Sequence, residues 1–406
     1  MASPQHATAP TALADRITCL AESATIKMAQ DSRELKNQGF DVADLSLGEP
    51  DFDTPEHIKE AGIQAIRDNY SHYTPVPGYL SLRQAIAEKL KRDNNLQYDP
   101  SQIVVSTGAK QSIANLILCL CNPGDEVILP APYWVSYPAM VQLAEANTVT
   151  IPTTVSHNFK ITPQQLEEAI TPNTKAFLFS SPCNPTGAVY SEEELGALAE
   201  VFERHPHVTI ISDEIYEYIR FSEGHPTIAS FTKLKDRTVV ANGLSKGVAM
   251  TGWRVGYIAA PEQLAKACTK MQGQFTSGTC GIAQKAAETA ISSDLSPTFQ
   301  MRDIFKERKE LVLKELKTID GLSPNKPEGA FYVFPNVEVF LGTTYHDWHI
   351  ETAVDLCSYL LNVWHVSTVP GDAFGSPGHI RLSYAASDAT LKEALDRLKR
   401  GLQALC

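Results

Sequence analysis

Residues 242–257 read NGLSKGVAMTGWRVGY and place a lysine, Lys246, in a short loop directly after an apolar, strand-like run. In open α/β sheets, ligands bind at the carboxyl ends of the strands, so Lys246 occupies a candidate site. Its neighbours are small or apolar, which disfavours the ammonium form and leaves an amine able to attack a carbonyl carbon. Arg254 follows eight residues later and keeps a charge suited to a phosphate group. The stretch therefore predicts an α/β protein with a reactive lysine beside an anion-binding arginine.

The sequence on both sides of this stretch alternates strand-like and helix-like segments. Several of the strand-like runs are apolar almost throughout, as strands covered on both faces are. The expected strands are residues 103–106, 126–129, 176–179, 209–212, 238–241 and 255–259. Helix starts are indicated by Thr162 before Pro163 and by the capping pair Ser191 and Glu194. This alternation predicts an α/β fold around a mainly parallel sheet.

The chain of 406 residues is long enough for two domains. After about residue 298 the alternation gives way to a charged helix, short strands and an apolar helix, which indicate a smaller α+β domain. We expect a large domain over residues 48–297 and a small domain over residues 1–47 and 298–406. Residues 1–47 carry a helix but no sheet of their own, so they should pack on the small domain or on a partner subunit.

Composition excludes several classes of function. The net charge is −12, which argues against a broad nucleic-acid surface. The N-terminal sequence MASPQHATAP lacks a basic segment followed by an apolar run, and no run of 18 uncharged apolar residues exists. We therefore expect a cytoplasmic protein with no membrane segment.

The metal-ligating residue types do not form a recognisable site in the sequence. The eight cysteines show no CxxC pair and lie mostly in apolar runs, which is typical of buried free thiols. His346 and His349 have the i, i+3 spacing of a helix, but no third ligand accompanies them. No metal site is expected.

Three further motifs carry polar groups to the same sheet edge. Asp213 ends an apolar strand and is followed by Tyr216; a helix N-cap is the alternative explanation for the aspartate. Asn184 lies in the rigid turn of SSPCNPTGAVY, where it could equally serve only to stabilise the turn. Gly108 and Ala109 open a helix whose free N–H groups suit a phosphate, a weak signal alone.

The motifs LGEPDFDTP, PYWVSYP, SPCNPTGAVY, SDEIYE and SKGVAMTGWRVGY follow one another in this order. With them the chain resembles, nearly end to end, the fold type I aminotransferases dependent on pyridoxal 5′-phosphate (PLP), specifically the bacterial aspartate aminotransferase group. The resemblance implies a large domain with a mainly parallel seven-stranded sheet, a smaller α+β domain and PLP as cofactor. It also implies a homodimer with shared active sites, acting on amino acids and 2-oxo acids by a ping-pong mechanism.

The resemblance also assigns roles in holding the cofactor. It implies that Lys246 forms an aldimine with PLP and later carries the proton between substrate and cofactor. Asp213 would pair with the pyridine nitrogen, keeping the ring an electron sink. The other implied contacts are Tyr216 and Asn184 at the ring 3-oxygen, Trp134 on the ring face, and Arg254, Gly108, Ala109, Lys110 and Tyr73 of a second subunit at the phosphate. Arg381 would bind the substrate α-carboxylate as a fork, with the backbone of Gly48 closing over it.

Two positions depart from the pattern of many relatives. Gly243 stands where a phosphate-binding serine is common, so that either Ser245 takes over or the phosphate has one contact fewer. Cys183 replaces a frequent asparagine but need not contact the cofactor.

The choice of substrate rests on fewer residues. Lys110, with Ser23 and Thr25 as lid contacts, would bind a distal carboxylate and favour aspartate and glutamate; contact with the phosphate or solvent alone is the alternative. Aromatic amino acids and prephenate stay open, as does a PLP-dependent lyase on the same fold. A PLP-sensing regulator would need a basic DNA-binding module before the motifs, and a dinucleotide enzyme would need GxGxxG after an early strand. Both are absent from the sequence.

Overall fold

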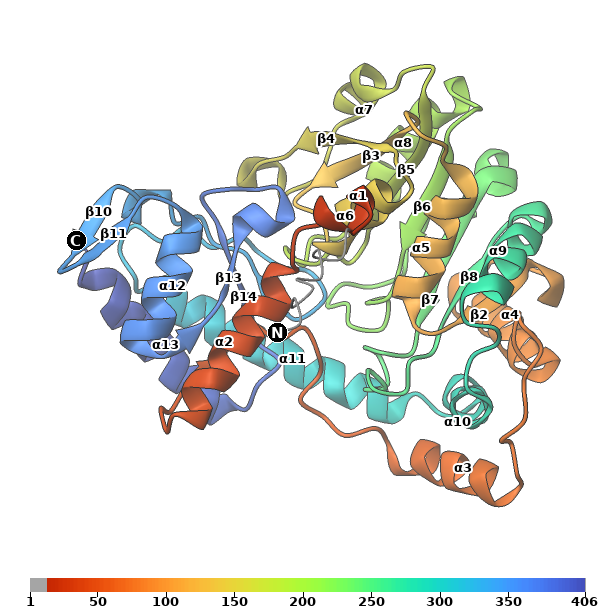
Figure 1. Ribbon diagram of the computed structural model, residues 1–406, viewed down its shortest axis with the longest axis horizontal. Helices are drawn as coiled ribbons and strands as arrows, with labels where there is room; N and C mark the ends of the chain where they lie inside the picture. Colours follow the sequence, from red (N-terminus) through yellow and green to blue (C-terminus); the bar gives the residue numbers. More distant parts are fainter. Residues whose placement is uncertain (1–12, 406) are drawn as a thin grey trace, which may run out of the picture.

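The computed structural model describes residues 13–405 and is built around one seven-stranded sheet (Figure 1). In spatial order its strands are β2 (Ile103–Ser106), β8 (Gly256–Ala259), β7 (Thr238–Gly243), β6 (Thr209–Asp213), β5 (Thr174–Ser180), β3 (Glu126–Ala131) and β4 (Asn147–Pro152). Strand β8 runs antiparallel to both β2 and β7, and the remaining pairs are parallel. The prediction of an α/β fold with a mainly parallel seven-stranded sheet is confirmed.

Helices cover both faces of the sheet because neighbouring strand residues point to opposite sides. On β6, Ile211 packs into the cluster under α5 (Ala109–Leu120), α6 (Ser136–Leu143) and α9 (Glu262–Phe275). Its neighbour Ile210 packs against α8 (Glu192–Arg204) on the other face. Further along that face lie α3 (Glu56–Arg67), α4 (Leu80–Asn94) and α10 (Gly281–Ser292). The short helix α7 (Pro163–Ala169) begins at the expected cap, where Thr162 accepts a hydrogen bond from the backbone of Gln165.

All six expected strands are present, with bounds shifted by at most two residues. Strand β4 was not among the expected strands, and its residues NTVTIP are mostly exposed or half-buried. Among the described strands β4 pairs only with β3, so it forms an edge of the sheet. This edge is largely open to water, so β4 carries polar residues and lacks the apolar run of the other strands, whereas the opposite edge strand, β2, is buried throughout.

The C-terminal part of the chain forms a second group of elements beside the sheet (blue in Figure 1). The long helix α11 (Ser296–Leu316) runs between the two groups. The group contains β9 (Tyr332–Val333), β10 (Thr343–Tyr345), β11 (Trp348–Ile350), α12 (Ala353–Trp364), β12 (Val366–Ser367), β13 (Val369–Pro370), β14 (Ile380–Ser383) and α13 (Asp388–Gln403). Strands β13, β14 and β9 make an antiparallel sheet, and the helices bury one continuous apolar cluster. The exact division into domains at residues 47/48 and 297/298 stays a prediction.

The N-terminal segment joins this second group. After the short α1 (Asp15–Thr18), helix α2 (Ala24–Asn37) packs near β12 and β13. The next strand, β1 (Ala43–Asp44), pairs in parallel with β12, Ala43 opposite Val366. Thus the segment has no sheet of its own but supplies one strand to the C-terminal group, which agrees with the expected packing.

The i, i+3 spacing of the two histidines does not come from a helix. His346 and His349 do not share a helix face: His346 lies in the turn of the β10–β11 hairpin with φ 48°, and His349 lies in β11. The polar sequence YHDWHIE suits a hairpin as well as a helix, and spacing alone did not separate them. Over residues 13–405, none of the helices combines the length and the apolar character needed to cross a membrane.

Candidate active site

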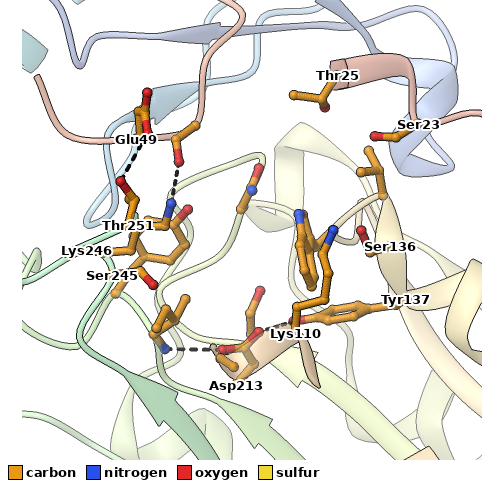
Figure 2. A pocket seen from close by; sticks show the side chains of 18 of the residues that line it. Ser23, Thr25, Glu49, Lys110, Ser136, Tyr137, Asp213, Ser245, Lys246 and Thr251 are labelled. Atoms are coloured by element: carbon orange, nitrogen blue, oxygen red, sulfur yellow. Dashed lines mark hydrogen bonds between the residues drawn. The ribbon is translucent and has the colours of Figure 1, made fainter. Parts of the chain in front are cut away.

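A cavity of about 310 Å³ opens at the carboxyl ends of β5, β6 and β7, beside the start of α5. This volume falls in the range of small-molecule sites. Figure 2 shows Asp213 at its floor, Lys246 and Glu49 on one side, Lys110 on the other, and Ser23 and Thr25 above. The predicted site residues that line it are Ser23, Thr25, Gly48, Ala109, Lys110, Trp134, Asn184, Asp213, Tyr216, Ser245, Lys246, Arg254 and Arg381.

Lys246 is half-buried in the turn after β7, and its amine faces the cavity. Its Nζ donates a hydrogen bond to the backbone oxygen of Gly48 (Figure 2). Burial lowers the pKa of Lys246 to about 8, although the carboxylate of Glu49 acts in the opposite direction. A substantial fraction of the side chain is therefore neutral near physiological pH, which a nucleophilic amine requires.

Asp213 ends β6 and is buried. Its Oδ2 accepts a hydrogen bond of 2.6 Å from the hydroxyl of Tyr137, and its Oδ1 accepts one of 3.2 Å from the backbone N–H of Ile215. The second bond closes an Asx-turn, and residues 215–218 form a turn and not a helix, so the alternative explanation as a helix N-cap is wrong. Burial raises the pKa of Asp213 to about 6 despite these donors. The carboxylate thus lacks a full positive partner among the described residues, and a ligand cation could supply one.

The start of α5 and Arg254 form an anion-binding corner. Gly108 caps the helix with φ 82°, and a Cβ at this position would lie 2.5 Å from Nη2 of Arg254. Gly108 does not line the cavity itself, but its missing side chain lets the guanidinium approach the helix start. A Cβ at Gly256 would lie 2.1 Å from the backbone nitrogen of Ala109, so glycine there lets α5 begin against β8. Helix N–H groups and a guanidinium together favour a phosphate.

Arg381 on β14 reaches the cavity from the C-terminal group and is 1% exposed. Its Nη1 donates to Oδ1 of Asn184 at 3.0 Å and its Nη2 to the backbone oxygen of Ser46 at 2.5 Å. Its Nε is buried and has no hydrogen-bond partner in the described part of the chain. Because no carboxylate within residues 13–405 pairs with it, this guanidinium is suited to the carboxylate of a ligand.

Lys110 forms a second cationic position in the cavity. Its Nζ lies 4.9 Å from the ring centre of Trp134. Burial and the nearby Arg254 lower its pKa. Figure 2 shows this side chain on the side of the cavity that faces Ser23, Thr25 and Ser136.

Two tyrosines were missed by the sequence analysis although they contact predicted site residues. Tyr137 bonds to Asp213, and the hydroxyls of Tyr332 and Tyr216 lie 2.7 Å apart. Burial raises the pKa of Tyr216 well above its usual value. Tyr137 lies inside the quoted motif PYWVSYP, and Tyr332 lies in FYVFP, but nothing in either stretch indicates which residue it contacts.

One predicted residue stays apart from the site. Tyr73 is 98% exposed and does not line the cavity of its own chain. Cys183 is half-buried, and its thiol lies 3.7 Å from the backbone oxygen of Pro132 rather than in this cavity. The seven described cysteines are free, but Cys19 and Cys280 are exposed, which corrects the expectation of burial for these two.

Comparison with known proteins places this cavity in a family. The family described as "Aminotransferase class I and II" matches residues 41–398. A bifunctional aspartate aminotransferase and glutamate/aspartate-prephenate aminotransferase of Petunia hybrida is 45% identical over 96% of this chain and 82% of that protein. The aspartate aminotransferase of Bacillus subtilis is 43% identical over 96% of this chain and 98% of that protein.

Solved structures agree with the sequence comparison. The aspartate aminotransferase from Rhizobium meliloti superimposes with a TM-score of 0.94 at 42% identity, covering 98% of this chain and all of that one. The Thermus thermophilus aspartate aminotransferase with maleate gives a TM-score of 0.91 at 38% identity, covering 96% of this chain and all of that one. This chain therefore belongs to the aminotransferase class I and II family, as a PLP-dependent transferase.

Proposed function

We propose that this enzyme moves the amino group of aspartate to 2-oxoglutarate. The observation that carries the proposal is the presence of two separate cations, Arg381 and Lys110, in the cavity that holds Lys246. A dicarboxylic amino acid needs one cation for each carboxylate. The names of the relatives in Petunia and Bacillus support this choice, as does maleate, a four-carbon dicarboxylate, in the Thermus structure.

The residues of the cavity fit PLP. Lys246 offers a half-buried amine with a lowered pKa. Asp213 offers a buried carboxyl group with a raised pKa, and a pyridinium would stabilise its ionised form. The Gly108–Arg254 corner fits the phosphate, and Trp134 offers a ring face. When bound, PLP supplies the electron sink that stabilises negative charge at the substrate α-carbon.

The chain's own groups would then orient the substrate and move one proton. Arg381 would bind the α-carboxylate through its fork, with the backbone of Gly48 beside it. Lys246, once free of the cofactor, would take the proton from the substrate α-carbon and return it to the cofactor carbon on the other side of the transferred nitrogen. Tyr216 and Asn184 would hydrogen-bond the 3-oxygen of the ring, and Ser245 the phosphate.

The proposal extends to assembly and location. We propose a homodimer in which Tyr73 reaches the phosphate site of the partner subunit, since its side chain is 98% exposed. The working division is a large domain of residues 48–297 and a small domain of residues 1–47 and 298–406, the second bringing Arg381 to the site. The cytoplasm is the proposed location.

Prephenate is the second candidate substrate. The relatives in Petunia hybrida and Nitrosomonas europaea, both 45% identical, are named for prephenate as well as aspartate. Prephenate, like aspartate, carries two carboxylates, so the same pair of cations could serve both.

An absorbance spectrum of the PLP-loaded protein, with aspartate alone and then with 2-oxoglutarate, tests the proposal. We expect the visible cofactor band to be lost with aspartate and to return with 2-oxoglutarate. A band unaffected by aspartate but lost with an aromatic amino acid would contradict the substrate, and absence of any band would contradict the role of Lys246.

A further inference from the structure

A buried charged network lies next to the cavity, outside its lining. Its centre is the carboxylate of Glu217, four residues after Asp213. Lys89 on α4 is only 2% exposed, and its Nζ lies 2.5 and 2.6 Å from the two oxygens of Glu217. Asn94, also on α4, donates to Glu217 at 3.0 Å and accepts from Lys89 at 2.8 Å.

The same carboxylate is also bonded to the loop that carries Lys246. Asn242 at the end of β7 donates to Oε1 of Glu217 at 2.9 Å. The side-chain oxygen of Asn242 accepts a hydrogen bond of 2.7 Å from the backbone N–H of Gly243. Asn242 thus fixes the backbone three residues before Lys246, while Glu217 directly follows Tyr216.

We propose that Glu217 is a positioning residue that, through Asn242, sets the loop of Lys246 against the loop of Asp213 and Tyr216. This inference rests on the proposed function, in which these two loops hold one cofactor. Lys89 neutralises the carboxylate so that it can stay buried between them. A buried ion pair contributes little net stability over apolar residues of the same size, whereas it does fix geometry through directional bonds.

A metal site is the alternative use of this cluster. Oxygens of Glu214 and Glu217 and a ring nitrogen of His225 lie within 4.8 Å of one another. However, Nζ of Lys89 already occupies both oxygens of Glu217, and Nε2 of His225 lies 2.9 Å from Glu214. A cation would have to enter beside an ammonium, so the cluster is explained by internal pairing.

Asn242→Ala and Asn94→Ala form a matched pair for the test. Each removes one buried amide that donates to Glu217, but only Asn242 is joined to the loop of Lys246. In the PLP-loaded enzyme we expect Asn242→Ala to slow the half-reaction with aspartate by about tenfold and to move the pH midpoint of the visible band. Asn94→Ala should leave the midpoint in place and the rate within about twofold. Thermal unfolding of both variants measures their effect on stability.

Equal effects of the two variants on rate, band and unfolding temperature would overturn the proposal, as would an Asn242→Ala enzyme that behaves like the wild type. If Asn242→Ala does not fold, the double variant Lys89→Met/Glu217→Gln replaces it. This double variant removes both charges but keeps an acceptor for Asn242, so the band midpoint should stay in place; a shifted midpoint would overturn the role of Asn242. Failure of the wild type to react with aspartate would instead count against the proposed function.

Discussion

Tyr137 in the first turn of α6 donates a hydrogen bond of 2.6 Å to Asp213 at the end of β6. The bond stabilises the ionised carboxylate, because a hydroxyl donor favours the charged form. It also fixes the carboxylate at the floor of the cavity. Replacing either residue separates these two effects.

Tyr137→Phe should weaken cofactor binding. Without the hydroxyl, the pKa of Asp213 rises further, and a neutral acid pairs less well with a cationic ring. Loss of a hydrogen bond to a charged group corresponds to about tenfold in the Kd for PLP. Fluorescence titration of the cofactor-free protein with PLP measures this Kd. An unchanged Kd would contradict the role of this bond.

Asp213→Asn should stabilise the cofactor-free protein while abolishing transamination. The folded pKa of Asp213 is about 6 against an ordinary value of 3.8, so folding favours the protonated acid. The stability that the raised pKa of Asp213 gives the folded protein is fully present below about pH 4 and is lost as the pH rises through 6. The amide of the variant carries no charge, so its stability does not fall as the pH rises, although it offers one hydrogen-bond acceptor fewer. Above pH 6 the free energy of unfolding of the variant should therefore exceed that of the wild type by about 1–2 kcal/mol.

Urea unfolding of the cofactor-free wild type and of this variant checks the prediction across the pH range. The gain should be constant above about pH 6 and shrink between 6 and 4. A gain that grows as the pH falls would refute the assignment of the raised pKa to Asp213.

Glu49→Gln should speed the capture of PLP by the cofactor-free protein near neutral pH. The charge of Glu49 raises the pKa of Lys246, which is about 8 in the wild type. Removing that charge lowers this pKa, so the amine becomes reactive at a lower pH. The effect should be small because the Glu49 side chain is exposed to water. Stopped-flow absorbance at several pH values gives the midpoint. A midpoint that moves upward would show that Glu49 does not act through its charge.

Lys110→Ser should impair aspartate much more than an aromatic amino acid. Loss of the cation removes a charged bond to the distal carboxylate, with about a tenfold rise in KM for aspartate. Steady-state kinetics with both substrates measure the difference. Equal rises for the two would mean that Lys110 acts only on the phosphate.

Mixing two inactive variants tests the shared site. In a dimer formed from Lys246→Ala and Tyr73→Ala chains, one site keeps both its own Lys246 and the partner's Tyr73. Random exchange of subunits should therefore restore about a quarter of the wild-type activity. Each variant mixed with itself is the control, and a mixture as inactive as its parts would argue against a Tyr73 that crosses between subunits.

The central sheet could be predicted because its strands are buried on both faces and are therefore apolar runs. The same reasoning could not find β4, since an edge strand such as NTVTIP carries polar residues. Nor could periodicity separate the β10–β11 hairpin from a helix in YHDWHIE.

For the site, Lys246 and Asp213 could be named because each follows or ends an apolar strand, whereas Arg381 was named only through the resemblance to the aminotransferases. Their partners could not be named in this way. The Tyr332–Tyr216 contact spans 116 residues, and the Lys89–Glu217 pair spans 128. Such contacts depend on how whole elements pack, which one sequence does not specify.

The pairing of β1 with β12 has a consequence for how the protein is made. Ala43 lies opposite Val366, and the backbone N–H of Ser383 donates to the oxygen of Leu45. During synthesis, the segment that carries Ser46 and Gly48 therefore cannot pair with β12 and Ser383 until more than three hundred further residues have been made. A nascent chain that has left the ribosome as far as α10 contains Lys246 and Asp213 but lacks the arginine that would select a substrate. We expect such a chain to be able to hold its cofactor before it can discriminate among amino acids.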